Sequence, residues 1–399
     1  MSWDKVKLAD CCLSISDGDH QPPPKAVSGV PFVTIANINK SNQFDFSDTM
    51  FVPKDYYDRL DSKRKAQVGD ILYSVVGSFG IPVLIKEERP FVFQRHIAIL
   101  RPNERINSAF LYYTMLSRDF YAKADAAAIG AAQRTVSLTS LRGMEIELPP
   151  LKVQETIASK LSVYDNLIEN NQKQIKLLEE AARRLYKEWF VNFRFPGYED
   201  TPIVDGVPEG WEKAPIDSRI SLLSEYAFKS AQFDSSGEYK IVTIKNVKDG
   251  EFDGINTNRI VSIPGKMPKH CVLTDGDILL SLTGNVGRTC IVNGNNYLLN
   301  QRVAKLQSDI PAFTYCLFRS SDMFDAMNNL ANGTAQQNLS PIRTGKISIL
   351  FPADNLLEEF ERIVGSMISK MLSLIKQCDL LIQARDRLLP KLMSGEIEV

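Results

Sequence analysis

Residues 68–77 read VGDILYSVVG, and residues 275–284 read DGDILLSLTG. Each block is followed by a Gln-Arg pair, at Gln94-Arg95 and at Gln301-Arg302. Both matches have the same offset of 207 residues (276 − 69 and 301 − 94). A short apolar run bounded by glycine is typical of a buried strand. The chain therefore contains an internal repeat whose best-preserved block is a strand with its flanking turns.

The likeness extends along both halves of the chain. WDK at 3–5 matches WEK at 211–213, and GAAQ at 130–133 matches GTAQ at 333–336. The second match has an offset of 203 residues (333 − 130), so a four-residue deletion separates the two registers. Two copies on one chain would form a body with approximate two-fold symmetry. Such a body suits a target that consists of two similar sites at a fixed separation.

Composition places the chain among soluble globular proteins with two or three domains. It has 399 residues, of which 44% are hydrophobic and 24% charged. Six cysteines without a CxxC spacing indicate neither a disulfide framework nor a zinc site, and no stretch has the apolar length of a membrane span. We therefore expect a cytoplasmic protein. A net charge of −1 argues mildly against nucleic-acid binding, unless basic groups gather on one face or partner subunits supply positive charge.

Each repeat is expected to be a mixed α/β (α+β) domain followed by one long helix. The expected strands lie at 31–38, 71–76, 83–86, 97–101, 241–247, 278–282, 289–292 and 303–307, and the expected short helices lie at 108–123 and 313–328. The domain boundaries that we expect are 1–150 for the first globular domain, 151–194 for its helix, 195–210 for a connector rich in Pro, Gly and Asp, 211–353 for the second globular domain, and 354–399 for its helix and C-terminal tail. We refer to 1–194 as repeat 1 and to 211–399 as repeat 2.

Both long helices carry an apolar stripe with steps of three and four residues, the heptad spacing of a coiled coil. A helix of about 40 residues is roughly 60 Å long and must bury such a stripe. We expect the two helices to pair as an antiparallel coiled coil with pseudo-two-fold symmetry; the alternative is that each helix packs only on its own domain. The stripe residues that we assign to the interface are Ile157, Leu161, Ile168, Leu178, Trp189, Phe360, Met371, Leu381 and Leu392.

Two polar residues interrupt this stripe. Asn171 fills one gap, where it would either be buried and fix the register of the helices or face solvent. Arg385 occupies the position that Ala182 has in the first copy, and it could extend to solvent or meet an acidic residue.

Signatures of catalysis and metal binding are largely missing. The three histidines, His20, His96 and His270, are scattered, and GNVGRT at 284–289 lacks the spacing of a phosphate-binding loop. Glu238-x-Lys240 matches a fragment of metal-dependent nucleases, but the first copy has no counterpart. We therefore expect no catalytic residue and no metal in this chain.

Polar residues in and beside the repeated blocks are the alternative functional candidates, because Arg, Gln and Asn can hydrogen-bond base edges. Residues identical in both copies more plausibly brace the fold, since two units that read different sequences should differ where they read. The candidates for DNA binding, in which we keep the two shared arginines, are Asn37, Asn39, Lys40, Arg95, Arg134, Lys245, Asn246, Lys248, Arg302, Gln337 and Asn338.

In this order the blocks resemble the specificity subunit of type I restriction-modification systems (HsdS family), and the resemblance covers essentially the whole chain. Further marks are LPPL at 148–151 with QETI at 154–157, VPEGW at 207–211, and LPKLMSGEI at 389–397. One departure is Phe351-Pro352-Ala353, which keeps one of the two prolines at 149–150 and makes the start of the second helix less certain.

The resemblance implies a non-catalytic DNA reader made of two tandem target-recognition domains. Each domain would read one half of a bipartite double-stranded DNA site, and the antiparallel helices would set the spacer. Two modification subunits would use S-adenosylmethionine to methylate adenine, restriction subunits would use ATP and Mg²⁺, and this chain would bind no cofactor. The alternatives are an assembly or decoy scaffold for modification subunits that does not read DNA, and the DNA-reading part of a fused nuclease-methyltransferase.

Overall fold

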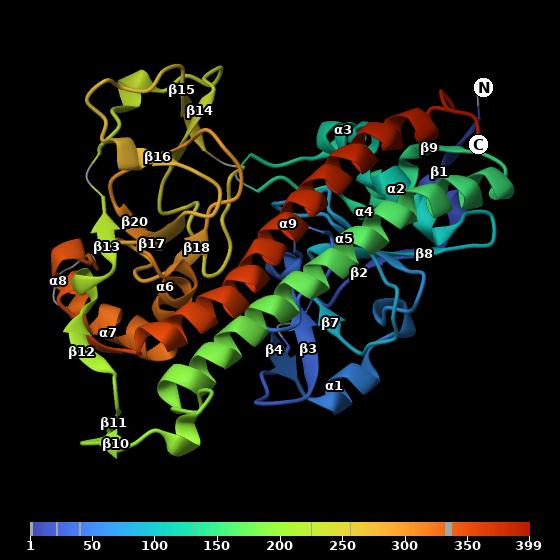
Figure 1. Cartoon of the computed structure of the whole chain (residues 1–399). Helices are drawn as coiled ribbons and strands as arrows, with labels where there is room; N and C mark the ends of the chain where they lie inside the picture. The colour runs from blue at the N-terminus through green and yellow to red at the C-terminus, as the bar shows by residue number, and fades with distance from the viewer. Residues whose placement is uncertain are drawn as a thin grey trace. The chain divides into compact units, whose positions relative to one another are not determined.

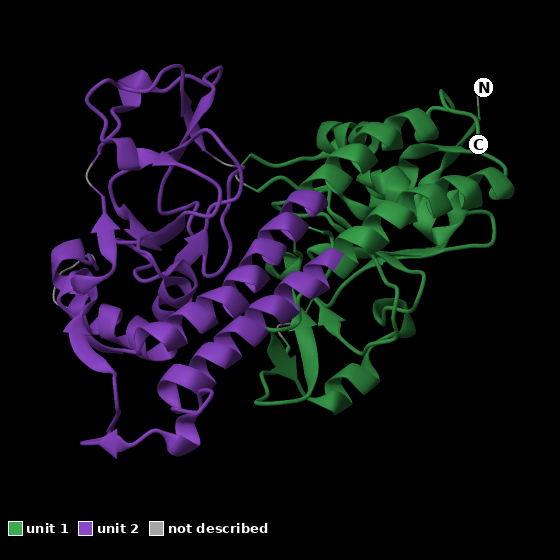
Figure 2. Cartoon of the chain, in the orientation of Figure 1, with its two compact units in different colours: residues 1–170, 379–399 green, residues 171–378 purple. Residues whose placement is uncertain are grey.

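The computed structural model describes residues 3–20, 23–39, 41–131, 133–224, 226–255, 257–331 and 337–399. The chain divides into two compact units (Figure 2). Unit 1 comprises Met1–Asn170 and Asp379–Val399, and unit 2 comprises Asn171–Cys378. Each unit therefore contains one globular domain, the beginning of the helix that follows it, and the end of the other repeat's helix.

Over the residues that the structure describes, unit 1 contains three small sheets (Figure 1). The largest is antiparallel, with the order β2 (Cys12–Asp17), β8 (Ile97–Pro102), β5 (Ile71–Ser74) and β6 (Pro82–Leu84). The second has the order β4 (Met50–Val52), β3 (Val30–Val33) and β7 (Val92–Phe93), with β3 and β7 parallel. The third pairs β1 (Asp4–Lys7) with β9 (Glu145–Leu148).

Unit 2 repeats this topology, which confirms the internal repeat and the mixed α/β class. The sheet that matches the largest sheet of unit 1 has the order β13 (Ser221–Leu223), β20 (Val303–Gln307), β17 (Ile278–Ser281) and β18 (Thr289–Ile291). The second has the order β15 (Asn258–Ile260), β14 (Tyr239–Val242), β19 (Tyr297–Leu299) and β16 (Val272–Leu273), where β16 is an added edge strand. The third pairs β12 (Glu212–Pro215) with β21 (Ser348–Phe351).

The repeated Gly-Asp blocks form the corner that begins the central strand of each large sheet. Gly69 and Gly276 have φ values of +90° and +92°, a conformation that favours glycine. The aspartate that follows then pairs with a basic residue on the neighbouring strand, Asp70 with Arg101 at 2.8 Å and Asp277 with Lys305 at 2.8 Å. The blocks are therefore repeated because they fold the corner, and this supports a structural role for the residues that they share.

Serine caps split each expected short helix into two. The region expected as one helix at 108–123 forms α2 (Ser108–Leu116) and α3 (Arg118–Ala127), because the Ser117 hydroxyl accepts the Phe120 N–H and starts a new helix. The matching region forms α6 (Pro311–Phe318) and α7 (Ser321–Ala331), where Ser320 accepts the Met323 N–H. The remaining short helices are α1 (Lys54–Arg59), α4 (Leu138–Gly143) and α8 (Pro341–Gly345).

Two of the expected strands are also too long. β3 ends at Val33 and β14 ends at Val242, because the Thr-x-x-Asn segments that follow them turn the chain. In the segment after β3, this turn is a short 3-10 helix at Ile35–Asn37.

The two long helices are α5 (Leu151–Tyr186), which continues as a π-helical turn to Val191, and α9 (Asp354–Met393). In unit 1 the helices are joined by an ion pair between Asp165 and Arg385. In unit 2 they are joined by a hydrogen bond between Asn171 and Gln377 and by the packing of Trp189 on Phe360. Because higher residue numbers on α5 meet lower numbers on α9, the helices run antiparallel within each unit.

Each helix packs in both units. The core of unit 1 combines Ile157 and Leu161 of α5 with Leu389 and Leu392 of α9 and the apolar face of α2. The core of unit 2 combines the end of α5, at Tyr186 and Trp189, with the start of α9. Burying each such large side chain stabilises the fold by about 1.5–3 kcal/mol. The alternative in which each helix packs only on its own domain is therefore wrong.

The expected connector contains ordered structure. It forms a short hairpin between β10 (Ile203–Val204) and β11 (Val207–Pro208). The turn residues Asp205 and Gly206 both have positive φ, the geometry of a type I′ turn, for which Asp-Gly is a favoured sequence.

Over the described residues, no helix combines the length and apolar character that crossing a membrane would require. The domain boundaries given above stay a prediction.

Candidate nucleic-acid interface

The polar blocks singled out in the sequence meet at one edge of the large sheet in unit 1. β5 is followed there by the Gly77 turn, and β8 is preceded by Arg95 and His96. The Val75 N–H donates to the His96 carbonyl at 2.9 Å, and the Gly77 N–H donates to the Arg134 carbonyl at 2.9 Å. Three segments distant in sequence therefore form one edge.

Unit 2 has the same edge. The Leu282 N–H donates to the Arg302 carbonyl at 2.9 Å, and the Leu339 N–H donates to the Leu282 carbonyl at 2.7 Å. Thr283 forms a β-bridge with Asn338 beside the Gly284 turn. The segment 333–336, which the sequence matches to GAAQ at 130–133, lies outside the described residues.

The two shared arginines have the same environment at these edges. Arg95 and Arg302 are exposed, and neither guanidinium has a hydrogen bond or ion pair with any residue that the structure describes. Arg302 also has a φ of +75°, which costs a non-glycine residue about 1–3 kcal/mol. The structural role that we favoured for residues shared by both copies therefore does not hold for these two side chains. An exposed guanidinium without a partner is suited to a phosphate group.

Asn37 and Asn246 brace loops instead. The Asn37 side-chain oxygen accepts the Thr34 N–H at 2.8 Å, and the Asn246 oxygen accepts the Thr243 N–H at 2.8 Å. Both lie three residues after a matched threonine, so they are the same position in the two repeats and not divergent positions. Asn246 is also 1% exposed, and its amide nitrogen donates to the Asp253 carbonyl. The prediction that Asn37 and Asn246 differ between the repeats and read bases is therefore wrong, because both side chains brace the same loop in the two repeats.

Three further candidates already have partners in the structure. Arg134 pairs with Asp125 at 2.5 Å and lies over the Phe79 ring, and Lys248 pairs with Asp253 at 3.0 Å. The Asn39 side chain accepts the N–H groups of two nearby residues and shapes its own loop.

The last candidates are exposed or outside the described residues. Lys245, Gln337 and Asn338 are exposed, and among the described residues Lys245 has no side-chain partner. Lys40 lies outside the described residues. No sequence pattern predicted one neighbour of this edge, the stacked pair Phe79 and Tyr121, whose ring centroids are 5.8 Å apart.

Most of the stripe residues that we assigned to the interface lie inside the cores of the chain itself. Leu178 and Leu381 are half-buried, and the buried members are Ile157, Leu161, Ile168, Trp189, Phe360, Met371 and Leu392. The apolar side chains that stay exposed on the helices include Leu177 and Leu380, with 64% and 65% exposure. These two leucines are matched positions of the two repeats, at the offset of 203 residues (380 − 177). Both polar interruptions are buried or nearly so, since Asn171 is 7% exposed and the Arg385 side chain 11%.

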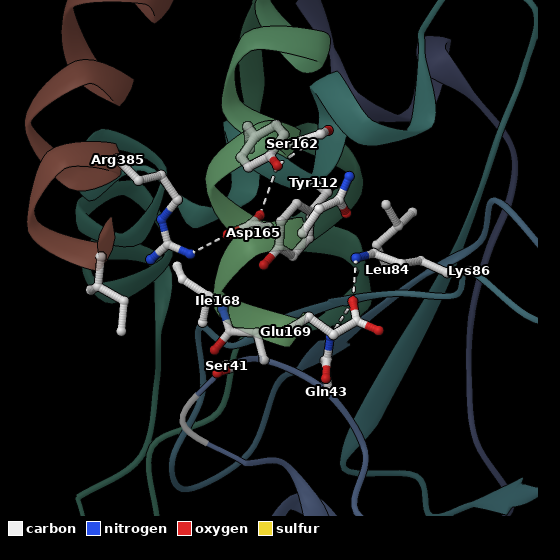
Figure 3. A pocket seen from close by; sticks show the side chains of 14 residues that line it. Ser41, Gln43, Leu84, Lys86, Tyr112, Ser162, Asp165, Ile168, Glu169 and Arg385 are labelled. Carbon is white, nitrogen blue, oxygen red and sulfur yellow. Dashed lines mark hydrogen bonds and ion pairs between the residues drawn. The ribbon is translucent and has the colours of Figure 1, made fainter. Parts of the chain in front are cut away.

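A small polar cavity of about 60 Å³ lies in unit 1 between α2, the helices α5 and α9, and the loop at 41–43 (Figure 3). Asp165 accepts from Arg385 at 2.6 Å and from the Tyr113 hydroxyl at 2.7 Å. Glu169 accepts from Lys86 at 3.0 Å and from Gln43 at 3.1 Å.

Burial alone would lower the pKa of the Arg385 guanidinium, but the carboxylates of Asp165 and, to a smaller extent, Asp386 outweigh this effect and the pKa is raised. The charged groups of the cavity are thus paired with one another, and they connect the globular domain to the helices. Among the described residues, no cluster of His, Cys, Asp and Glu has the arrangement of a metal site.

The chain is similar in sequence to proteins of one known family. The model of the type I restriction modification DNA specificity domain matches residues 2–180 and 208–367. The MjaIX specificity subunit of Methanocaldococcus jannaschii is 25% identical over 83% of this chain and 78% of its own length. The HindI specificity subunit of Haemophilus influenzae is 22% identical over 99% of both chains.

Among solved structures, the S subunit of a type I restriction-modification system from M. genitalium is similar in fold. Its TM-score is 0.57 at 16% identity, with 98% of this chain and 96% of that chain covered. The family model matches two stretches that together make up most of the chain, one in each repeat. Because the family model covers well over half of the chain, this protein belongs to the family of type I restriction modification DNA specificity domains, whose members confer DNA sequence specificity.

Proposed function

We propose that this chain is the non-catalytic specificity subunit of a type I restriction-modification complex. Each globular domain reads one half of a bipartite DNA site, and the helix pair sets the number of base pairs between the halves. Modification subunits then methylate adenine with S-adenosylmethionine, and restriction subunits act with ATP and Mg²⁺. The chain itself binds none of these cofactors.

One observation carries the proposal. Each domain presents the same arginine, Arg95 or Arg302, at the same edge of its sheet, and neither guanidinium has a partner among the residues that the structure describes. At this edge, Arg134 is matched by Gln337 and Thr135 by Asn338, and in the segments that follow β3 and β14, Ala36 is matched by Lys245. A phosphate contact that is common to both domains, flanked by polar groups that differ, is what two readers of different base sequences require.

The exposed leucines of the helices support the partner assignment. Leu177 and Leu380 occupy matched positions and stay about two-thirds exposed. A leucine at this exposure gains from being covered by an apolar surface. Two equivalent leucines suit two copies of one partner, as the assignment of two modification subunits requires.

The decisive experiment maps methylated adenines in cells that contain the modification subunits and this chain. Exchange of 1–150 for the corresponding domain of another family member should change one half of the methylated sequence and keep the other half and the spacer. An unchanged pattern would favour the scaffold alternative. The purified chain, given Mg²⁺, S-adenosylmethionine and DNA, should show no turnover, and turnover would favour the fused-enzyme alternative.

A further inference from the structure

Two buried ion pairs join repeat 1 to repeat 2. In unit 1, Asp165 of repeat 1 binds Arg385 of repeat 2 at 2.6 Å, and their side chains are 16% and 11% exposed. In unit 2, Glu179 of repeat 1 binds Arg319 of repeat 2 at 2.5 Å, and their side chains are 20% and 5% exposed. In both pairs, repeat 1 supplies the acid and repeat 2 supplies the arginine.

Apolar residues replace each pair at the matched positions of the other unit. At the offset of 203 residues, Asp165 and Arg385 correspond to Ile368 and Ala182, which belong to the apolar cluster of unit 2. At the same offset, Arg319 corresponds to Leu116 and Glu179 to Ile382. The serine caps at 117 and 320 support this alignment, since each follows the matched position directly. At each of these two matched pairs of positions, one unit therefore has an ion pair where the other unit has two apolar residues.

We propose that these two ion pairs make each repeat select the other repeat as its helix partner and reject a second copy of itself. If repeat 1 paired with repeat 1 of another chain in the same geometry, Asp165 would face Ala182 and Glu179 would face Leu116. If repeat 2 paired with itself, Arg385 would face Ile368 and Arg319 would face Ile382. Each self-pairing places charges of one sign in buried positions without the opposite charge, which is strongly unfavourable.

The ion pair of Asp165 with Arg385 should oppose self-pairing of repeat 2 more strongly than the ion pair of Glu179 with Arg319 does, because the two arginines would keep different contacts. In a self-pair of repeat 2, Arg319 would keep its ion pair with Asp249 at 2.6 Å, whereas Arg385 would keep only the half-exposed Asp386. In a self-pair of repeat 1, Asp165 would keep only the hydroxyl of Tyr113. By contrast, Asn171 discriminates little. In a self-pair of repeat 1 it would meet Gln174, which matches Gln377, and in a self-pair of repeat 2 the exposed Gln377 side chain would face Leu374 and stay hydrated.

Selection of this kind matters during synthesis of the chain. Repeat 1 and its apolar helix emerge first, and the remaining 200 or so residues take about 10–40 s to synthesise. During this time the stripe on α5 has no partner within its own chain, while neighbouring nascent chains carry the same helix. Rejection of self-pairing leaves the helix of repeat 1 free to pair with repeat 2 of its own chain. This advantage does not depend on whether the domains read DNA.

The test uses the full chain with a protease site inserted between Asp205 and Gly206, at the tip of the connector hairpin. The folded protein is cut, unfolded in denaturant and refolded, and native mass spectrometry counts the mixed and self-paired assemblies. For the natural sequence, mixed assemblies should exceed self-paired ones by about tenfold or more. The all-apolar variant, Asp165→Ile, Arg385→Ala, Glu179→Ile and Arg319→Leu, copies the matched residues of the other unit. It should approach random pairing, with about half of the assemblies mixed.

Two controls complete the design. Exchange of the charges, Asp165→Arg with Arg385→Asp, should keep the preference for mixed pairs, and Asn171→Leu should leave the mixed share unchanged. Random pairing of the natural sequence, or equal selectivity of the all-apolar variant, would overturn the proposal. The uncut chain gives a second readout: after refolding at high concentration, the all-apolar variant should contain more dimer by light scattering, and an equal dimer fraction would also overturn the proposal.

Discussion

The ion pair between Asp165 and Arg385 should show strong energetic coupling in unit 1. Removing one partner of a buried ion pair typically costs about 3–5 kcal/mol, because the other charge stays buried and unpaired. Asp165 keeps the Tyr113 hydroxyl in the Arg385→Ala variant, so we expect a cost at the low end, about 3 kcal/mol. Asp165→Ile should cost a similar amount, because Arg385 then keeps only the half-exposed Asp386. The double variant should cost about 1 kcal/mol or less, since unit 2 already holds Ile368 and Ala182 at the matched positions.

The assay is hydrogen exchange of the backbone amides at 379–393, the part of α9 that belongs to unit 1. It reports the free energy of local opening, which suits a chain of two compact units better than one global unfolding transition. Asp386→Ala is the matched control, because Asp386 binds the same arginine from a side chain that is 49% exposed, and it should cost less than about 1 kcal/mol. If the single variants cost no more than this control, or if the double variant cost the sum of the two, the pair would not act as a coupled buried pair.

Three other predictions follow from the edges and the helices. Arg95→Ala and Arg302→Ala should each weaken DNA binding by the assembled complex about tenfold at all DNA sequences, and should reduce the slope of log affinity against log salt concentration by about one, as measured by titration. Arg59→Ala, which removes an exposed ion pair, should change neither the affinity nor this slope. A loss of affinity that depends on the DNA sequence would indicate base contacts instead. Leu177→Glu and Leu380→Glu should weaken the binding of modification subunits in pull-down assays without lowering the melting temperature of this chain. Unchanged binding would show that these leucines do not contact the modification subunits. Adding four residues to both long helices extends each by about 6 Å, so the spacer in the methylated sequence should lengthen by roughly two base pairs while both half-sites are kept. An unchanged spacer would show that the helix pair does not set the distance between the half-sites.

The sequence predicted the repeat and the long helices well because both depend on local pattern. The Gly-Asp blocks specify a corner through the φ of Gly69 and Gly276, and such a requirement is visible in one residue. The heptad stripe on α5 and α9 predicts a buried helix face without any knowledge of what covers it. The predicted strands at 278–282 and 303–307 match β17 and β20 within one residue, since their apolar runs are bounded by turn residues on both sides.

The errors arose where side chains compete with the backbone for hydrogen bonds. Ser117 and Ser320 cap new helices inside what periodicity predicts as single ones, because a hydroxyl can replace the missing carbonyl acceptor. Asn37 and Asn246 were candidates for reading bases because Asn can hydrogen-bond base edges, although the match of VTI at 33–35 with VTI at 242–244 makes them equivalent at an offset of 209 residues (246 − 37). The matched hydrogen bonds to Thr34 and Thr243 show that the two asparagines have one structural role.

A duplicated reader has two conflicting requirements, and different residues meet each of them. The repeats must share a fold, so the corner residues and the loop-bracing asparagines are the same in both. They must also differ where the proposed function has them read bases, as Ala36 and Lys245 do, and differ where they pair, as Asp165 and Ile368 do. Identity alone therefore does not separate function from structure in this chain, because the shared Arg95 and Arg302 are left without partners among the described residues, whereas the shared asparagines are fully used. The discriminating property is whether the chain itself satisfies the polar group: a group that the fold already uses maintains the repeat, and one that the fold leaves unsatisfied at the surface is available to a ligand.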